Sequence, residues 1–157
     1  ERKTFFKFSN HNLPFIGIIF VIFVQIIIGA FVSGLDAGKI YQTWPMMGNS
    51  YIPDDLTFKS YANFVEFENH SLVQFYHRNL AYLIVLYILI LSFYIYRNKI
   101  NSLYIPINFL LFFLFLQATL GVLTLVSGLN IYLASAHQIT SVLLIFSALN
   151  LYYFRAK

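Results

Sequence analysis

Charged residues are scarce in this sequence, and cysteine is absent. Only 10% of the 157 residues are Asp, Glu, Lys or Arg, whereas a soluble domain usually carries about 25%. Between Ile100 and Asn150 none of these four residue types occurs. The lack of cysteine excludes disulfide frameworks, thiolate zinc sites and cysteine nucleophiles. This composition predicts an integral membrane protein.

An initiating methionine is also missing, because the sequence begins with Glu1. The apolar run that starts at Leu13 lacks the small-residue cleavage site of a secretory signal peptide. We therefore expect the chain to be part of a longer protein and not a signal peptide followed by a mature domain.

Hydrophobic residues make up 59% of the chain and aromatic residues 20%. A helix needs roughly 20 apolar residues to cross a bilayer. Four segments meet this requirement, at about 13–34, 72–96, 103–127 and 130–154. We predict an all-α fold, a single four-helix transmembrane bundle over residues 1–157, with one long loop at 36–71.

The positions of the charges predict an orientation. Seven of the ten basic residues are expected at one end of the bundle, namely Arg2, Lys3, Lys7, Arg97, Lys99, Arg155 and Lys157, and five of the six acids lie in the long loop. The positive-inside rule then places both termini in the cytoplasm or matrix and the loop outside. Because the basic residues flank helix ends, the chain is expected to contact membrane lipid and no nucleic acid.

An internal repeat is indicated by two segments, QIIIGAFVSGL (25–35) and QATLGVLTLVSGL (117–129). Each has Gln, then Gly four residues later, then VSGL, and each precedes a helix with one histidine near its outer end. The pattern predicts a duplicated helical hairpin with a large loop inserted in the first copy. Such a repeat brings equivalent residues from two sides to one central site.

Two histidines are expected at matched depth in the membrane. Ser71 and Gln74 predict a capping box, which puts His77 six residues into its helix, about 9 Å along the axis. Asn130 predicts the other cap, with His137 seven residues in, at about 10 Å. Ionisable residues within spans are rare and usually functional, although a single histidine near a helix end can also hydrogen-bond a loop carbonyl.

The histidine pair suits haem iron better than zinc. No cysteine or acid is expected at the same depth to complete a zinc site, whereas haem iron needs only two axial ligands, which facing helices of a bundle can supply. Small residues that leave room for a macrocycle are Gly29, Ala30, Ala81, Ala118, Gly121, Ala134 and Ser141. Such residues are equally common wherever membrane helices pack.

Other polar residues allow alternative interpretations. Arg78 can pair with a haem propionate or extend to the interface as a snorkelling side chain. His11 is expected to be solvated on the inner side, and His70 to lie in the loop before the helix cap. The apolar-aromatic stretch YQTWPMM (41–47) is expected to cover the outer edge of the haem or to serve as an interfacial anchor. Glu66 and Glu68 are expected to be solvated loop acids or to lie near the edge of the haem.

The sequence resembles the haem A synthase family. The motifs that carry the resemblance are VSGLDAGKIYQTWPMM (32–47), FENHSLVQFYHRNLAY (67–82), LQATLGVLTLVSGL (116–129) and LASAHQ (133–138). These enzymes oxidise a methyl group of haem O to the formyl group of haem A, and consist of two similar four-helix halves. The resemblance implies that this chain is the C-terminal half, in the bacterial plasma membrane or the mitochondrial inner membrane.

The resemblance also implies roles for individual residues. His77 and His137 correspond to the axial ligands of a haem b. Gln74 stands where the N-terminal half of the family carries a Glu implicated in catalysis; because Gln cannot take up a proton, it serves at most as a hydrogen-bonding neighbour of the site. The implied partners are the N-terminal half, which holds haem O, and an electron donor of unknown identity.

Two other functions remain open on the residues alone. A stand-alone membrane cytochrome of the b type would use the same two histidines without substrate chemistry. A transporter half or assembly subunit, in which the histidines relay protons or simply pack, would bind no haem.

Overall fold

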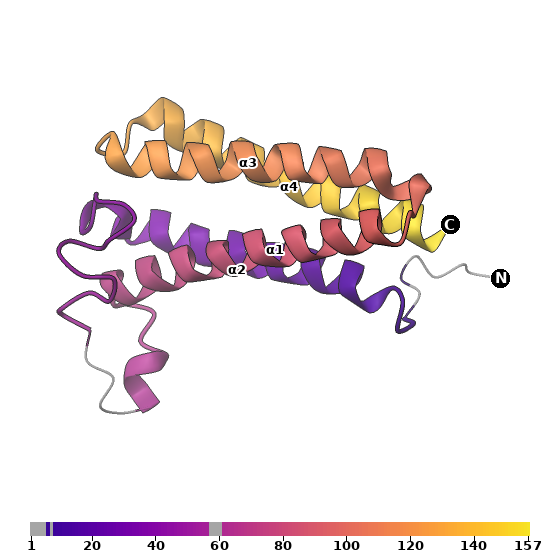
Figure 1. Ribbon diagram of the computed structural model, residues 1–157. Coiled ribbons are helices and arrows are strands. Elements are labelled where there is room, and N and C mark those ends of the chain that lie inside the picture. The colour runs from indigo at the N-terminus through magenta and orange to yellow at the C-terminus, as the bar shows by residue number, and fades with distance from the viewer. Residues whose placement is uncertain (1–5, 7, 57–60) are drawn as a thin grey trace.

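Four long helices form the bundle in the computed structural model, which describes residues 6, 8–56 and 61–157 (Figure 1). They are α1 (Leu13–Gly34), α2 (His70–Arg97), α3 (Tyr104–Val126) and α4 (Ile131–Ala156), with short 3-10 helices η1 (Ala37–Lys39), η2 (Tyr61–Phe64) and η3 (Asn101–Leu103) between them. All four are long and apolar enough to cross a membrane. The predicted helices are confirmed; the orientation across the membrane stays a prediction.

The helices pair as two antiparallel hairpins, α1 with α2 and α3 with α4 (Figure 1). The start of α1 and the end of α4 lie at the same end of the bundle, which we call the inner end, and the long loop lies at the outer end. The α3–α4 turn is tight because Gly128 and Leu129 both adopt positive φ, 72° and 64°. The two hairpins therefore have the same orientation: α2 and α4 both begin at the outer end and finish at the inner end.

The beginning of α2 differs from the prediction. Asn69, not Ser71, caps the helix, and its side chain accepts a hydrogen bond from the Leu72 amide at 3.1 Å. The predicted capping box is wrong, and His70 is the first residue of the helix and not part of the preceding loop. At α4 the predicted cap is confirmed, since the Asn130 side chain accepts from the amides of Tyr132 and Leu133.

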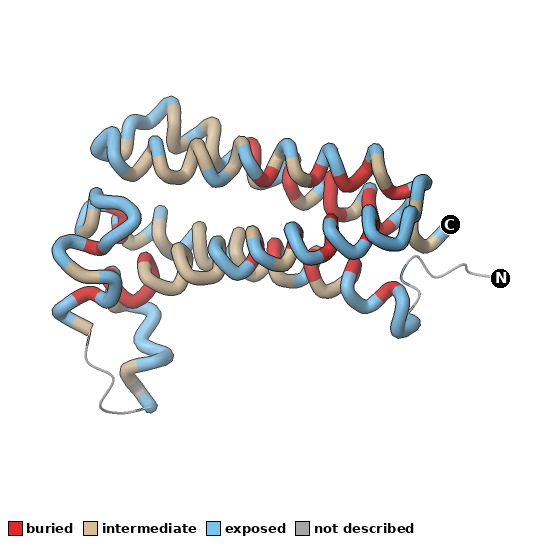
Figure 2. The backbone as a smooth tube through the Cα atoms, in the orientation of Figure 1, coloured by how far each residue is buried: buried red, intermediate tan, exposed pale blue. Residues whose placement is uncertain are grey.

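The apolar core occupies the inner half of the bundle. Its fully buried side chains include Phe15 and Ile18 of α1, Ile88 of α2, Ile107 of α3 and Tyr152 of α4. Figure 2 shows this concentration of buried residues toward the end that holds the C-terminus. At the same end Tyr87 donates a hydrogen bond to the Pro14 carbonyl at 2.8 Å and ties α2 to α1.

The outer half is packed differently. Beyond Ile22 in α1, Leu114 in α3 and before Thr140 in α4, every residue of these described helices is partly or fully exposed (Figure 2). Only the first turns of α2 are buried there, by contact with the long loop. The inner half thus holds the hairpins together, whereas no residue of α1, α3 or α4 is fully buried in the described outer half.

Candidate functional site

The two histidines meet between the hairpins in this outer half. The ring centroids of His77 on α2 and His137 on α4 lie 6.5 Å apart, with the ring planes at 81°. His77 comes eight positions after its cap Asn69 and His137 seven after Asn130, which corresponds to depths of about 12 and 10 Å along the helices. The structure therefore brings together the pair that the sequence indicated.

Each histidine has the same neighbours in its own hairpin. The Gln25 side-chain nitrogen lies 3.5 Å from His77 Nε2, and the Gln117 side-chain nitrogen lies 3.4 Å from His137 Nε2. One turn further along α1 and α3, Gly29 and Gly121 lie directly against the imidazole rings. The sequence repeat thus corresponds to a repeated site, although the part played by the two glutamines was not predicted.

A backbone carbonyl indicates the tautomer of His137. Because a carbonyl can only accept, a neutral ring whose Nδ1 is bonded to one carries its proton on Nδ1 and its lone pair on Nε2. The His137 Nδ1 proton is donated to the Gln117 backbone carbonyl at 3.1 Å. Neutral His137 consequently presents an unprotonated Nε2, which is the form that ligates a metal ion.

The two glycines make the close approach of the rings possible. A Cβ built on Gly121 would lie 2.9 Å from Cε1 of His137, and one on Gly29 would lie 3.1 Å from Cε1 of His77. Real Cβ atoms essentially never approach another heavy atom to under 3.0 Å. A side chain at position 121 would therefore displace the ring of His137, and one at position 29 would require a smaller shift of His77.

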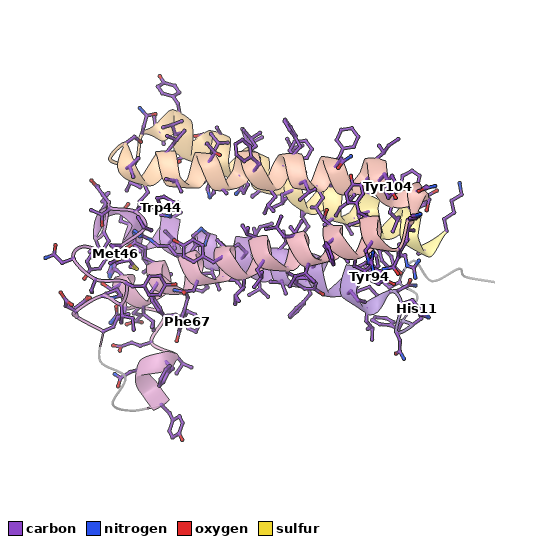
Figure 3. The ribbon with its side chains drawn as sticks, in the orientation of Figure 1. His11, Trp44, Met46, Phe67, Tyr94 and Tyr104 are labelled. Atoms are coloured by element: carbon purple, nitrogen blue, oxygen red, sulfur yellow. The ribbon has the colours of Figure 1, made fainter. Side chains whose placement is uncertain are left out.

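The long loop closes the outer end of the site. Arg78, the residue after His77, donates to three loop carbonyls: those of Thr43 at 2.8 Å, Met46 at 3.2 Å and Tyr41 at 2.8 Å. Gln74, one turn earlier, donates to the same Tyr41 carbonyl at 2.9 Å. Figure 3 places Trp44 and Met46 at this outer end. Arg78 thus anchors the loop, a role that neither sequence interpretation included.

The loop also reaches the second hairpin. A Cβ built on Gly38 would lie 3.0 Å from Cδ2 of Leu129, in the turn between α3 and α4. The described part of the loop therefore contacts α2 on one side and the α3–α4 turn on the other. It spans the outer end above both histidines.

A carboxylate holds the base of this loop. Asp55 accepts hydrogen bonds from the Ser71 hydroxyl at 2.6 Å and the Tyr41 hydroxyl at 2.8 Å. Burial opposes ionisation of Asp55, but the two hydroxyl donors outweigh it and hold the pKa of this carboxyl below its usual value. The same hydrogen bond from Tyr41 to Asp55, together with burial, raises the pKa of the Tyr41 phenol.

Acid should release this part of the loop. Because the pKa of Asp55 is lowered in the folded state, its contribution to stability is present above the ordinary value of about 4 and is lost as the pH falls through the lower folded value. Trp44, the single tryptophan, reports on the loop. We expect acrylamide quenching of Trp44 to rise as the pH falls below about 4 in the wild type, and to be high and insensitive to this titration in Asp55→Asn. Glu66→Gln, at an exposed loop carboxylate, is the control and should follow the wild type.

The other residues considered in the sequence lie away from the histidine pair or at the surface. His11 is exposed near the inner end, opposite the loop (Figure 3). His70, Glu66 and Glu68 are exposed at the outer end. Within the described residues no group of three or more His, Cys, Asp or Glu side chains could hold a metal ion. Arg2, Lys3 and Lys7, used for the orientation, lie outside the described residues.

These features define a class: a helical membrane protein made of two similar hairpins, each of which brings one histidine to a shared site near the outer end. The chain belongs to the COX15-CtaA family of cytochrome oxidase assembly proteins, whose family model matches residues 8–149. It is therefore an integral membrane protein related to the enzymes of haem A biosynthesis.

Individual relatives carry the name heme A synthase. The protein of Pelagibacter ubique is 40% identical over 146 residues, which cover 90% of this chain and 42% of the relative. That of the Wolbachia of Brugia malayi is 41% identical over 150 residues, covering 95% and 43%, and that of Rickettsia felis is 35% identical over 134 residues, covering 85% and 40%. The chain thus spans less than half the length of these relatives. No solved structure matches it.

Proposed function

We propose that this chain is the haem-b-binding half of a haem A synthase, with His77 and His137 as the axial ligands of the iron. The observation that carries the proposal is the meeting of the two imidazoles, 6.5 Å apart between ring centroids, each in the same glutamine and glycine setting. The names of the relatives support the enzyme family. We place the half at the C-terminal end of an eight-helix protein.

The residues present fit such a group. Neutral His137 donates its Nδ1 proton to the Gln117 carbonyl, so its Nε2 carries the lone pair that a metal ion takes. Glycines lie against both rings, and no side chain of α1, α3 or α4 is buried in the described outer half, whereas the inner half is filled with apolar side chains. Two imidazoles and no further ligand suit a haem iron and not a zinc ion.

The role of this half is electron transfer or structural support. Haem b would supply a one-electron couple, and an iron with both axial positions occupied by histidine has none left for oxygen or substrate. Gln74 cannot act as a general base, and its amide is used to hold the loop. The oxidation of the haem O methyl group to a formyl group would then belong to the other half of the protein, which is the proposed partner together with an electron donor.

The chain's own residues would orient and shield the cofactor. Gln117, through its backbone carbonyl, would keep His137 in the tautomer that ligates iron, and Gln25 would hold the α2 backbone at His77. Arg78 would hold the loop over the outer edge, where its remaining donor capacity can also serve a propionate. The loop stretch 41–47, with Met47 buried at 3% exposure, would limit access of water.

The direct test is a reduced-minus-oxidised visible spectrum of the detergent-purified protein supplied with haem b. We expect a low-spin b-type spectrum in the wild type and its loss in the double variant His77→Ala/His137→Ala. His11→Ala removes an exposed histidine at the opposite end and should leave the spectrum unchanged. A folded wild type that stays colourless would contradict the proposal and favour histidines that relay protons or only pack.

A further inference from the structure

The two halves of the repeat are not equivalent at the nitrogen that faces away from the proposed iron. His137 donates its Nδ1 proton to the Gln117 backbone carbonyl at 3.1 Å. The corresponding Nδ1 of His77 is buried and has no hydrogen-bond partner. The asymmetry arises although each ring has a glutamine and a glycine as neighbours.

Such a hydrogen bond changes an imidazole as a ligand. A metal-binding histidine that donates its other ring proton to a carbonyl has a fixed tautomer and ring orientation and is a more basic donor to the metal. Removal of this kind of partner typically costs about 10–100-fold in metal affinity. His137 has the partner and His77 lacks it.

The two glutamines add to the difference. The Gln25 amide lies 2.9 Å from the backbone carbonyl of His77 but 3.5 Å from its Nε2, so its shorter bond holds the α2 backbone and not the ring. Gln117 contacts only the ring of His137, through its amide and its carbonyl. Gly121 also lies closer to the ring of His137 than Gly29 does to that of His77, because a built Cβ would lie 2.9 Å from His137 Cε1 and 3.1 Å from His77 Cε1.

From this geometry we infer that the two histidines are unequal ligands: His137 is the anchor that retains the haem, and His77 is the exchangeable ligand. The inference rests on the proposed haem site and adds that its two ligands differ in how firmly they hold the iron. A strong external ligand such as carbon monoxide would take a position on the iron only by displacing His77, and His137 would stay bound. Gln117 is the positioning residue of the anchor, through its backbone carbonyl.

The test compares haem titrations of His77→Ala and His137→Ala in detergent, beside the wild type. We expect both variants to give high-spin spectra. His77→Ala should keep haem with an affinity at least about tenfold higher than His137→Ala, the low end of the range for such a partner. In the reduced state, the iron–histidine Raman band of His77→Ala should lie at higher frequency than that of His137→Ala, because only the remaining His137 has a hydrogen-bonded Nδ1.

A measurement on the wild type keeps the test independent of folding defects in the variants. After photolysis of its carbon monoxide adduct, the wild type should show the iron–histidine band of His77→Ala. Equal affinities of two folded variants, the reverse order, or a wild-type band that matches His137→Ala would overturn the inference. In each of those cases a low-spin wild-type spectrum still supports the proposed function, whereas a wild type without haem would reject both.

Discussion

Gly121→Ala is expected to weaken haem binding by about tenfold or more while the protein stays folded. The added Cβ would lie 2.9 Å from Cε1 of His137 and 3.4 Å from its Nδ1. The ring cannot swing away freely, because its Nδ1 is bonded to the Gln117 carbonyl. Displacing the ring breaks this bond or moves Nε2 from its place, and loss of such a bond costs about 10–100-fold in metal affinity.

Two other glycines give matched comparisons. Gly29→Ala brings a Cβ to 3.1 Å from Cε1 of His77, whose ring has no Nδ1 bond to lose, so a smaller loss is expected. Gly34, the last residue of α1, has open space around a built Cβ, and Gly34→Ala should leave haem affinity unchanged.

Haem titration and thermal unfolding together distinguish a loss of haem affinity from a loss of folding stability. In a helix interior, Ala is otherwise favoured over Gly by about 1 kcal/mol, so Gly121→Ala need not lower the stability of the haem-free protein. If Gly121→Ala bound haem as tightly as Gly34→Ala, the close contact between Gly121 and His137 would have no part in the site.

The helices and the histidine pair could be predicted because both depend on regular spacing. Apolar length alone located the four spans to within two residues of the observed bounds. Helical rise and the repeat placed His77 and His137 at one depth, since a duplicated hairpin must present equivalent positions to the same interior. Predictions of this kind require no knowledge of the loop.

The start of α2 could not be predicted, because distant residues compete with local ones there. Ser71 and Gln74 match a capping box, but the Ser71 hydroxyl donates to Asp55, 16 positions away, and the Gln74 amide donates to the Tyr41 carbonyl. Asn69 is then free to cap the helix. The same limit hid the role of Arg78, since its three acceptors are carbonyls positioned only by the folded loop.

The two glutamines were part of the sequence repeat, but no role at the site was predicted for them from the sequence. Gln25 and Gln117 stand one helical turn before Gly29 and Gly121, and their side chains reach the imidazoles only because the helices of each hairpin are antiparallel and closely packed. A glutamine in a membrane span needs hydrogen-bond partners for its amide. The histidine on the adjacent predicted helix was the sequence feature that could have indicated this contact.

Arg78→Ala is expected to detach the outer loop and destabilise the protein by about 2–4 kcal/mol, the scale for losing several hydrogen bonds from a charged donor. The guanidinium joins α2 to the carbonyls of Tyr41, Thr43 and Met46. We expect faster tryptic cleavage after Lys39, stronger quenching of Trp44, and a lower Tm in the haem-free protein. Arg78→Lys should recover only part of the loss, because a single ammonium cannot span three carbonyls as a planar fork does.

Arg97→Ala, at an exposed position at the opposite end of α2, is the control for the loss of one cationic side chain from the membrane interface. Equal behaviour of Arg78→Ala and Arg97→Ala in the haem-free protein would mean that Arg78 is a snorkelling residue with no part in holding the loop. Haem affinity then distinguishes a direct contact of Arg78 with a propionate from an effect of Arg78 through the loop. If Arg78 also pairs with a propionate, the charge-conserving Arg78→Lys should retain more haem affinity than Arg78→Gln, even where both variants leave the loop equally open. If it acts through the loop alone, haem affinity should follow Trp44 quenching across all three substitutions.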